Sequence, residues 1–145
     1  MISETDVRNL ATAFAKALDH NDFATAAAML APDCCYDLTR ASLSSEGTLT
    51  GPKAIVDSYR AHDAYARRLF DRIDYVSAVE AVDAMTAVIR FTDVLEKNGE
   101  RHTYYCRQRI ILDEKRQIQS IVQEDIPSEI AAVRAFMSRV GVSFD

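Results

Sequence analysis

The segment RFTDVLEKNGERHTYYCRQ, residues 90–108, decides how the second half of this chain folds. Two runs of alternating apolar and polar residues flank Asn98-Gly99, a dipeptide typical of a two-residue β-hairpin turn. A turn of that length fixes the pairing of the strands, because it places Lys97 directly opposite Glu100. The segment therefore predicts an antiparallel hairpin of defined register.

The hydrophobic pattern of the two strands agrees with this register. Asp93 lies opposite Tyr104 and Phe91 lies opposite Cys106, all on one face of the hairpin. That face collects the more apolar alternate set of each strand, namely Met85, Ala87, Ile89, Phe91 and Leu95 with Tyr104, Cys106, Ile110 and Leu112. Asp93 is then a carboxylate within an apolar surface, which makes it the first candidate for a functional residue.

Hydrophobic spacing and cap residues predict the other elements. Ser3 and Asp6 resemble a capping box at the start of a first helix, and Asn21 or Asp22 can cap a short second helix. Three helices followed by an antiparallel meander indicate the α+β class. The expected elements are the second helix to Leu30, a strand at 34–38, a loop at 39–50, a third helix from Gly51-Pro52, strands at about 71–80, 84–97, 100–112 and 116–126 with turns at Val82-Asp83 and Asp113–Arg116, and a helix from about Pro127 to Arg139.

The pattern of the last strand leaves its pairing open. If Asp113 pairs with Arg116, Tyr104 lies opposite Asp125, and two carboxylates then flank one tyrosine. A slip by one residue would instead turn inward the more apolar set of that strand, which is Ile118, Val122 and Ile126.

Composition limits the classes of function. The 145 residues suffice for one domain, 1–145, with a buried core. A net charge of -5 argues against nucleic acid or an anionic membrane as the main partner. No apolar run approaches transmembrane length, and the N-terminal MISETDVRNL lacks the features of a signal peptide, so a cytoplasmic location is expected.

The cysteines and histidines do not indicate a metal or redox centre. Cys34 and Cys35 are adjacent rather than spaced as CxxC, and the histidines are widely scattered in the sequence. We expect buried thiols in a reducing compartment, and neither a metal nor a cofactor.

The outward face of the predicted sheet suggests a partner. It is more apolar than a fully solvated surface requires, with Arg90, Thr92, Val94, Thr103, Tyr105, Arg107, Arg109 and Ile111. This composition suits a homodimer interface on the back of the sheet, and it equally suits an ordinary amphipathic surface.

Three short motifs resemble those of a known family. D-x-x-D at Asp19–Asp22, L-x-P-D at Leu30–Asp33 and G-x-x-A-I at Gly51–Ile55 precede the meander in this order. The chain, up to about Pro127, resembles the nuclear transport factor 2-like superfamily, and within it the SnoaL-like and ketosteroid-isomerase-like proteins. The resemblance implies a cone-shaped α+β barrel, with three N-terminal helices on a curved antiparallel sheet (core about 3–126) and a C-terminal helix at about 127–140.

The resemblance also implies a blind apolar pocket, and it favours Ile121, Gln123 and Asp125 as facing that pocket. It identifies the fold better than the activity, because this superfold hosts many functions. Most of the catalytic residues of the steroid isomerases are replaced: Leu38 stands at the position of their base, and Phe14 and Gln108 stand at those of their two donors. Only their supporting tyrosine is kept, as Tyr59, so steroid-type isomerisation is not expected.

The limonene-epoxide-hydrolase group offers a second comparison. Of its Arg-x-Asp pair and second aspartate, the chain keeps Asp93, whereas Phe91 and Gln123 replace the other two. Gln123 also replaces the last-strand aspartate of the SnoaL-type cyclases. The resemblance therefore carries over at most one residue of each catalytic set.

These considerations define a candidate site. Asp93, Tyr104 and Asp125 form the expected catalytic set, in which apolar surroundings and a second carboxylate raise the pKa of Asp93 and Tyr104 donates to the charged member. The expected ligand is a small apolar molecule, aromatic, terpenoid or steroid-like. The residues expected to contact it are Tyr36, Tyr59, Phe91, Gln108 and Gln123.

Two functions fit this site. The first is a cofactor-independent isomerase, cyclase, dehydratase or hydrolase with Asp93 as general base. The second is a non-catalytic ligand-binding or dimerisation module whose catalytic residues have been replaced. Each carboxylate also has a possible non-functional role. Asp93 can meet water at the end of its strand while it is hydrogen-bonded to Tyr104, and Asp125 can cap the last helix or face solvent.

Overall fold

The computed structural model describes residues 2–44 and 46–143 of the chain. The described part forms four helices and one six-stranded sheet, so the α+β class is confirmed. The elements are α1 (Glu4–Asp19), α2 (Phe23–Ala28), β1 (Leu30–Asp37), β2 (Thr48–Thr50), α3 (Pro52–Leu69), β3 (Arg72–Asp83), β4 (Thr86–Lys97), β5 (Glu100–Leu112), β6 (Ile118–Glu124) and α4 (Pro127–Val140).

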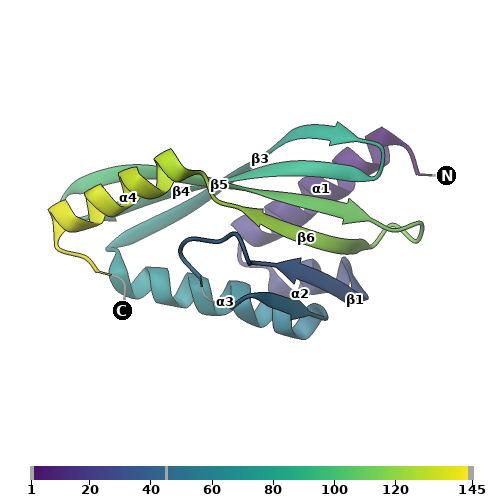
Figure 1. Ribbon diagram of the computed structural model, residues 1–145, viewed down its shortest axis with the longest axis horizontal. Helices are drawn as coiled ribbons and strands as arrows, with labels where there is room; N and C mark the ends of the chain where they lie inside the picture. Colours follow the sequence, from purple (N-terminus) through teal and green to yellow (C-terminus); the bar gives the residue numbers. More distant parts are fainter. Residues whose placement is uncertain (1, 45, 144–145) are drawn as a thin grey trace.

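The sheet is open and mixed rather than a closed antiparallel barrel. Its strand order is β2-β1-β6-β5-β4-β3, and β1 runs parallel to β6, whereas the other pairs are antiparallel. The expectation of a purely antiparallel sheet is therefore wrong, because β1 is connected through β2 and α3 and enters beside the last strand rather than the first of the meander. In Figure 1, α3 runs below the strands. The helix α4 lies at the left, at the end of the sheet where β4 turns into β5.

The helices begin as their cap residues predict. The Ser3 side chain accepts a hydrogen bond from the Asp6 amide and the Asp6 carboxylate accepts one from the Ser3 amide, which is the expected capping box of α1. Asp22 caps α2 by accepting from the Thr25 amide. No helix in the described residues is long and apolar enough to cross a membrane.

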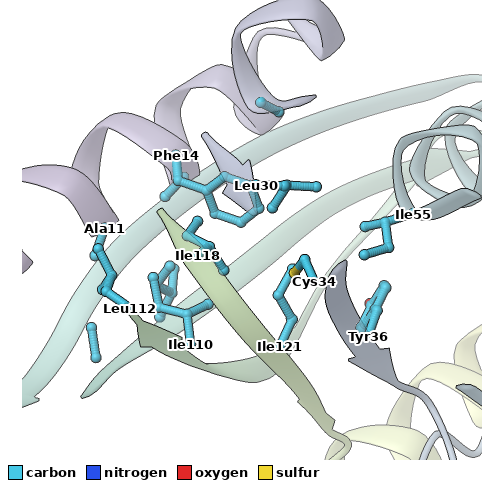
Figure 2. Close-up of a cluster of buried hydrophobic side chains, with 14 of the residues drawn as sticks. Ala11, Phe14, Leu30, Cys34, Tyr36, Ile55, Ile110, Leu112, Ile118 and Ile121 are labelled. Atoms are coloured by element: carbon cyan, nitrogen blue, oxygen red, sulfur yellow. The ribbon is translucent and has the colours of Figure 1, made fainter. Parts of the chain in front are cut away.

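Two apolar clusters hold the domain together. The larger one packs α1 and the start of α3 against the sheet, and Figure 2 shows Phe14, Ile55 and Ile121 within it. The second cluster lies under α4, where Phe136 packs with Leu95 and other buried side chains of the sheet. The concave face of the sheet between these clusters contains the candidate site.

The register of the β4–β5 hairpin is confirmed along its length. Asp93 pairs with Tyr104 and Phe91 with Cys106. Asn98 and Gly99 adopt positive φ angles of 53° and 78°, the left-handed conformation that this turn requires of both residues.

The expected pairing of β6 is wrong by two residues. Gln108 lies opposite Gln123, and Asp125, which follows the end of β6, does not pair with Tyr104. A shift of two residues leaves every side chain on its expected face, so Gln123 still points inward.

A β-bulge explains why the pattern of β6 was ambiguous. Ile111 pairs with Ser120 and Leu112 with Ile118, so Gln119 is an extra residue that reverses the alternation. Ile118 and Ile121 are consequently both buried, although an unbroken strand would place them on opposite faces.

Several boundaries differ from the predicted ones. The second helix ends at Ala28 and β1 begins at Leu30, ahead of the proline that was expected to end the helix. Part of the expected loop at 39–50 is a short strand, β2, which pairs with β1. The β3–β4 turn falls at Ala84-Met85 rather than Val82-Asp83, and Glu80 is an extra residue in a bulge of β3.

Candidate functional site

A cavity of about 280 Å³ opens between the two apolar clusters. It is largely apolar, and α4 closes part of it through Val133 and Met137. All eight predicted site residues line it, although they come from β1, α3, β4, β5 and the end of β6: Tyr36, Tyr59, Phe91, Asp93, Tyr104, Gln108, Gln123 and Asp125.

Asp93 lies in the wall of this cavity rather than at a hydrated strand end. Its side chain is half-buried, and within the described residues it takes part in no hydrogen bond. Burial raises the pKa of its carboxyl to about 7, and the negative charges of Asp19 and Asp63 add to the effect. The carboxyl is therefore close to half ionised at neutral pH.

Tyr104 lies opposite Asp93 but is not bonded to it. The expected hydrogen bond between the two is not formed, and no partner for the Tyr104 hydroxyl occurs in the part of the chain that the structure describes. Burial raises the pKa of this phenol, with further contributions from Cys106, Asp125 and Asp93. A neutral hydroxyl and a titratable carboxyl thus face the same apolar space.

The carboxylates whose charges act on Asp93 are Asp19 and Asp63, and not Asp125. Asp19 is the last residue of α1, and its Oδ2 accepts hydrogen bonds from the amide (3.1 Å) and the hydroxyl (2.6 Å) of Ser77 on β3. Asp63 on α3 accepts a hydrogen bond from the Tyr75 hydroxyl at 2.5 Å and pairs with Arg67 at 3.0 Å.

Sequence reasoning missed both of these carboxylates. Asp19 belongs to the D-x-x-D motif, which was interpreted only as a mark of the fold. Asp63 follows Tyr59 by four residues and so lies on the same face of α3, a spacing that could have identified it.

The predicted amides form a closed network with two tyrosines. Gln108 Nε2 donates to the Tyr36 hydroxyl (2.9 Å) and to Gln123 Oε1 (3.0 Å), and Gln108 Oε1 accepts from the Tyr59 hydroxyl (3.0 Å). The Tyr36 hydroxyl donates to Gln123 Oε1 at 3.1 Å. Gln108 and Gln123 are only 4 % and 8 % exposed, so little of either amide is open to a ligand.

Asp125 fixes the orientation of this network. Its Oδ1 accepts from Gln123 Nε2 at 2.9 Å, which turns Gln123 Oε1 toward Tyr36 and Gln108. Its Oδ2 accepts from the Ser42 amide at 2.5 Å, and so the same carboxylate holds the segment around Ser42. Asp125 therefore neither caps α4 nor joins Asp93.

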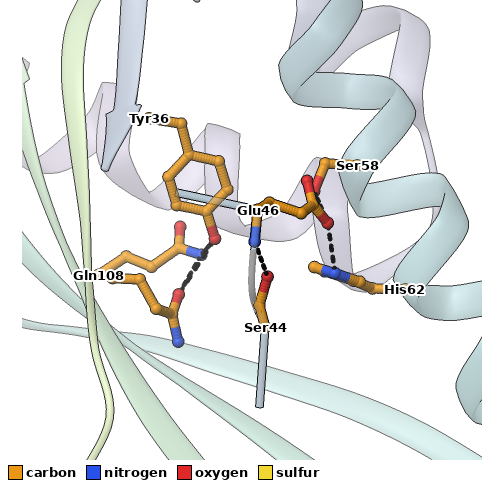
Figure 3. Close-up of polar contacts among 7 residues, drawn as sticks. Tyr36, Ser44, Glu46, Ser58, His62 and Gln108 are labelled. Carbon is orange, nitrogen blue, oxygen red and sulfur yellow. Dashed lines mark hydrogen bonds and ion pairs between the residues drawn. The ribbon is translucent and has the colours of Figure 1, made fainter. Parts of the chain in front are cut away.

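Glu46, just before β2, forms a further attachment to α3. Glu46 pairs with His62 Nε2 at 2.8 Å and accepts from the Ser58 hydroxyl at 3.1 Å, both on α3. Figure 3 shows this group beside Tyr36 and Gln108. Ala41, Leu43 and Ser44 contribute side chains to the wall of the cavity.

Phe91 and Cys106 complete the wall beside Asp93. Burial raises the pKa of the Cys106 thiol to about 12, and it does the same for the fully buried Cys34. Both thiols are therefore protonated at neutral pH and are weak nucleophiles.

A family model described as SnoaL-like domain matches residues 1–109. The chain belongs to the SnoaL-like domain family. No curated protein sequence matches this SnoaL-like protein.

Solved structures of other proteins share the fold of the SnoaL-like protein. An LEH-like epoxide hydrolase from Mycobacterium tuberculosis has a TM-score of 0.63 at 18% identity, covering 94% of this chain and 96% of the other. TerC, co-crystallised with polyporic acid, has a TM-score of 0.65 at 11% identity, covering 88% and 96%. A ketosteroid-isomerase-like protein from Kribbella flavida has a TM-score of 0.60 at 17% identity, covering 82% and 76%. These similarities place the fold in the nuclear transport factor 2-like superfamily.

Proposed function

We propose that the SnoaL-like protein binds a small, largely apolar molecule with a neutral oxygen group, and that Asp93 acts on it as a general base without a cofactor. The observation that carries this proposal is the contrast between the two polar parts of the cavity. The amide network has its donors bonded within the protein, whereas Asp93 and Tyr104 have no partner in the described residues. Unsatisfied polar groups in an apolar cavity are the groups that a ligand can bond.

The pKa of Asp93 suits this role. A base with a pKa of about 7 is substantially ionised at neutral pH and still strong enough to remove a proton. Asp93 would take a proton from a carbon next to a carbonyl, or from a water molecule. The Tyr104 hydroxyl would donate a hydrogen bond to the oxygen on which negative charge develops.

The related structures support this class of chemistry without defining the reaction. They include an epoxide hydrolase and a ketosteroid-isomerase-like protein. Isomerisation, cyclisation, dehydration and hydrolysis can each be catalysed by a positioned carboxyl group acting as a general base.

Ligand binding without catalysis is the second candidate. It is favoured by the substitution of Phe91 and Gln123 at positions where the resemblance expects an arginine and an aspartate. Because the Gln123 side chain is hydrogen-bonded to Asp125 and Tyr36, it stabilises the wall of the cavity and is not available to act on a ligand.

The test uses wild type, Asp93→Asn and the matched control Asp74→Asn, which makes the same change at an exposed position of the neighbouring strand β3. Steroids, terpenoids and aromatic polyketides are screened by thermal shift, and any stabilising compound is then incubated with each protein and analysed by mass spectrometry. We expect conversion by wild type and the control, and binding without conversion by Asp93→Asn.

The pH dependence provides a second criterion. Since the base must be ionised, kcat/KM should rise as pH increases through about 7 and then level off. If the proteins bind a compound and none of the three converts it, the non-catalytic function is supported. The absence of any stabilising compound would contradict both functions.

A further inference from the structure

Asp19 contains a polar atom whose position is unusual. Its Oδ2 accepts two hydrogen bonds from Ser77, but its Oδ1 is buried and has no hydrogen-bond partner in the described residues. A buried carboxylate oxygen without a donor is costly, so such an atom requires an explanation.

The sheet register places Asp93 beside Ser77, the residue that holds Asp19. Ser77 pairs with Phe91, and Asp93 is two residues further along β4, so Asp93 is the diagonal neighbour of Ser77 on the same concave face. Because Ser77 holds Asp19, the two carboxyl groups lie near one another and interact electrostatically. Asp19 Oδ1 and the Asp93 carboxyl both lack a hydrogen-bond partner in the described residues.

The other groups around Asp93 do not supply a hydrogen bond. Asp63 on α3 is fully occupied, because its oxygens accept from Tyr75, Asn21 and Arg67. Across the sheet, Asp93 faces Tyr75 on β3 and faces Tyr104 and Cys106 on β5, and none of these donates to it.

We infer that Asp19, held in place by Ser77, is a positioning residue that shares one proton with Asp93 before a ligand binds. The proton on Asp93 is donated to Asp19 Oδ1, which gives both unsatisfied groups a partner. The two donors from Ser77 suit an ionised Asp19, so the proton resides mainly on Asp93. Two adjacent carboxyl groups that share a proton titrate as a pair.

The functional consequence of this shared proton rests on the proposed function. Asp19 would set the pH at which Asp93 becomes a base. It would also favour a neutral oxygen-bearing ligand, because such a ligand can approach the pair without displacing the shared proton.

The experiment follows the carboxyl carbons by ¹³C NMR during a pH titration of the full chain without ligand. The Asp93 and Asp19 resonances are assigned by their loss in Asp93→Asn and Asp19→Asn. In wild type we expect the Asp93 resonance to shift with a midpoint near pH 7 and the Asp19 resonance to respond to the same step. An Asp19 resonance that does not respond to this step would overturn the inference, and this result requires no folded variant other than those used for assignment.

Asp19→Asn gives a second, independent result. The introduced asparagine can still accept the hydrogen bonds from Ser77, but it removes the negative charge and places an amide donor near Asp93. The Asp93 midpoint should therefore fall by about one pH unit or more. Asp83→Asn, the same change at an exposed residue of β3, should leave it unchanged.

An Asp93 midpoint that is the same in Asp19→Asn and wild type would also refute the shared proton. Neither measurement involves a ligand or a reaction. The pair can thus be established even if the proposed function fails, and the proposed function can hold even if the pair does not form.

Discussion

Asp93 shows how position alone gives a common side chain an uncommon chemistry. On a solvated strand it would be an ordinary anion, but here apolar side chains and two other carboxylates surround it. Its charged form is disfavoured in the folded protein and not in the unfolded chain. This difference links the stability of the fold to pH.

Asp93→Asn should be stabilising at high pH. The folded state has a pKa of about 7 against 3.8 for the unperturbed group, so wild type loses stability as pH rises from about 4 to 7 and has lost it fully above 7. Asparagine has no such loss. After allowance for the partial solvent contact of Asp93, the free energy of unfolding of the variant should increase relative to wild type by about 2 kcal/mol between pH 4.5 and pH 8.

Urea unfolding at the two pH values measures this difference. Asp74→Asn, on the outer side of β3, should show no comparable pH dependence. A difference between Asp93→Asn and wild type that is constant with pH would contradict the raised pKa.

Tyr36 tests the closed amide network. Replacement by phenylalanine removes the acceptor of Gln108 Nε2 and a donor to Gln123 Oε1, both in a buried site. We expect Tyr36→Phe to reduce the free energy of unfolding by about 1–3 kcal/mol. Tyr105→Phe, on the outward face, should change it by less than about 0.5 kcal/mol. Equal effects of the two changes, measured by chemical denaturation, would argue that the network is not closed.

At the residue scale, much of the site could be predicted because alternation and one turn determine which side chains share a face. Asp93, Tyr104 and Gln108 were located in this way. Their partners could not be located, since hydrogen bonds depend on side chains from α1 and α3 whose placement on the sheet is not encoded in any local period. Asp19 is therefore found only in the structure.

At the element scale, β6 shows where periodicity stops being informative. Both alternate sets of residues in β6 contain apolar side chains. The bulge at Gln119 turns one set inward before it and the other set inward after it. A bulge breaks the period of two that sequence analysis relies on. The parallel pairing of β1 with β6 was likewise not predictable, because these strands are far apart in sequence and neither flanks a tight turn.

The terminal helix α4 makes a separate contribution to stability. Phe136 is 1% exposed and packs under the helix with Leu95 and Val133. Phe136→Ala should lower the free energy of unfolding by about 3–5 kcal/mol, because it leaves a cavity in this cluster. Ser138→Ala, at an exposed position of the same helix, is the control and should have little effect. A loss below about 1 kcal/mol for Phe136→Ala would indicate that α4 is only loosely attached.

At the scale of the whole molecule, the outward face of the sheet is suited to association. Val76 is 58% exposed, and Val76, Thr92 and Tyr105 form one row across β3, β4 and β5. Two arginines beside this row contact Glu80 within the chain, Arg107 at 3.0 Å and Arg90 at 3.9 Å. We propose that a second copy of the chain covers this face, since paired charges are less costly to bury than free ones.

Val76→Arg tests this dimer. It adds an unpaired charge to the row, so we expect a shift from dimer to monomer in sedimentation velocity while the unfolding transition of the monomer is unchanged. Ser138→Arg adds the same charge at an exposed position of α4 and should leave the dimer intact. A wild-type protein that sediments as a monomer at high concentration would refute the proposal.

The two hydrogen bonds accepted by Asp125 have a consequence for ligand entry into the cavity. One oxygen of this carboxylate anchors the segment around Ser42, and the other dictates which way the Gln123 amide points. A movement of that segment to admit a ligand would weaken the hydrogen bond from the Ser42 amide to Asp125. The side-chain amide of Gln123 could then rotate and exchange the positions of its nitrogen and oxygen. Ligand entry would then be coupled to the orientation of this amide through the Asp125 side chain.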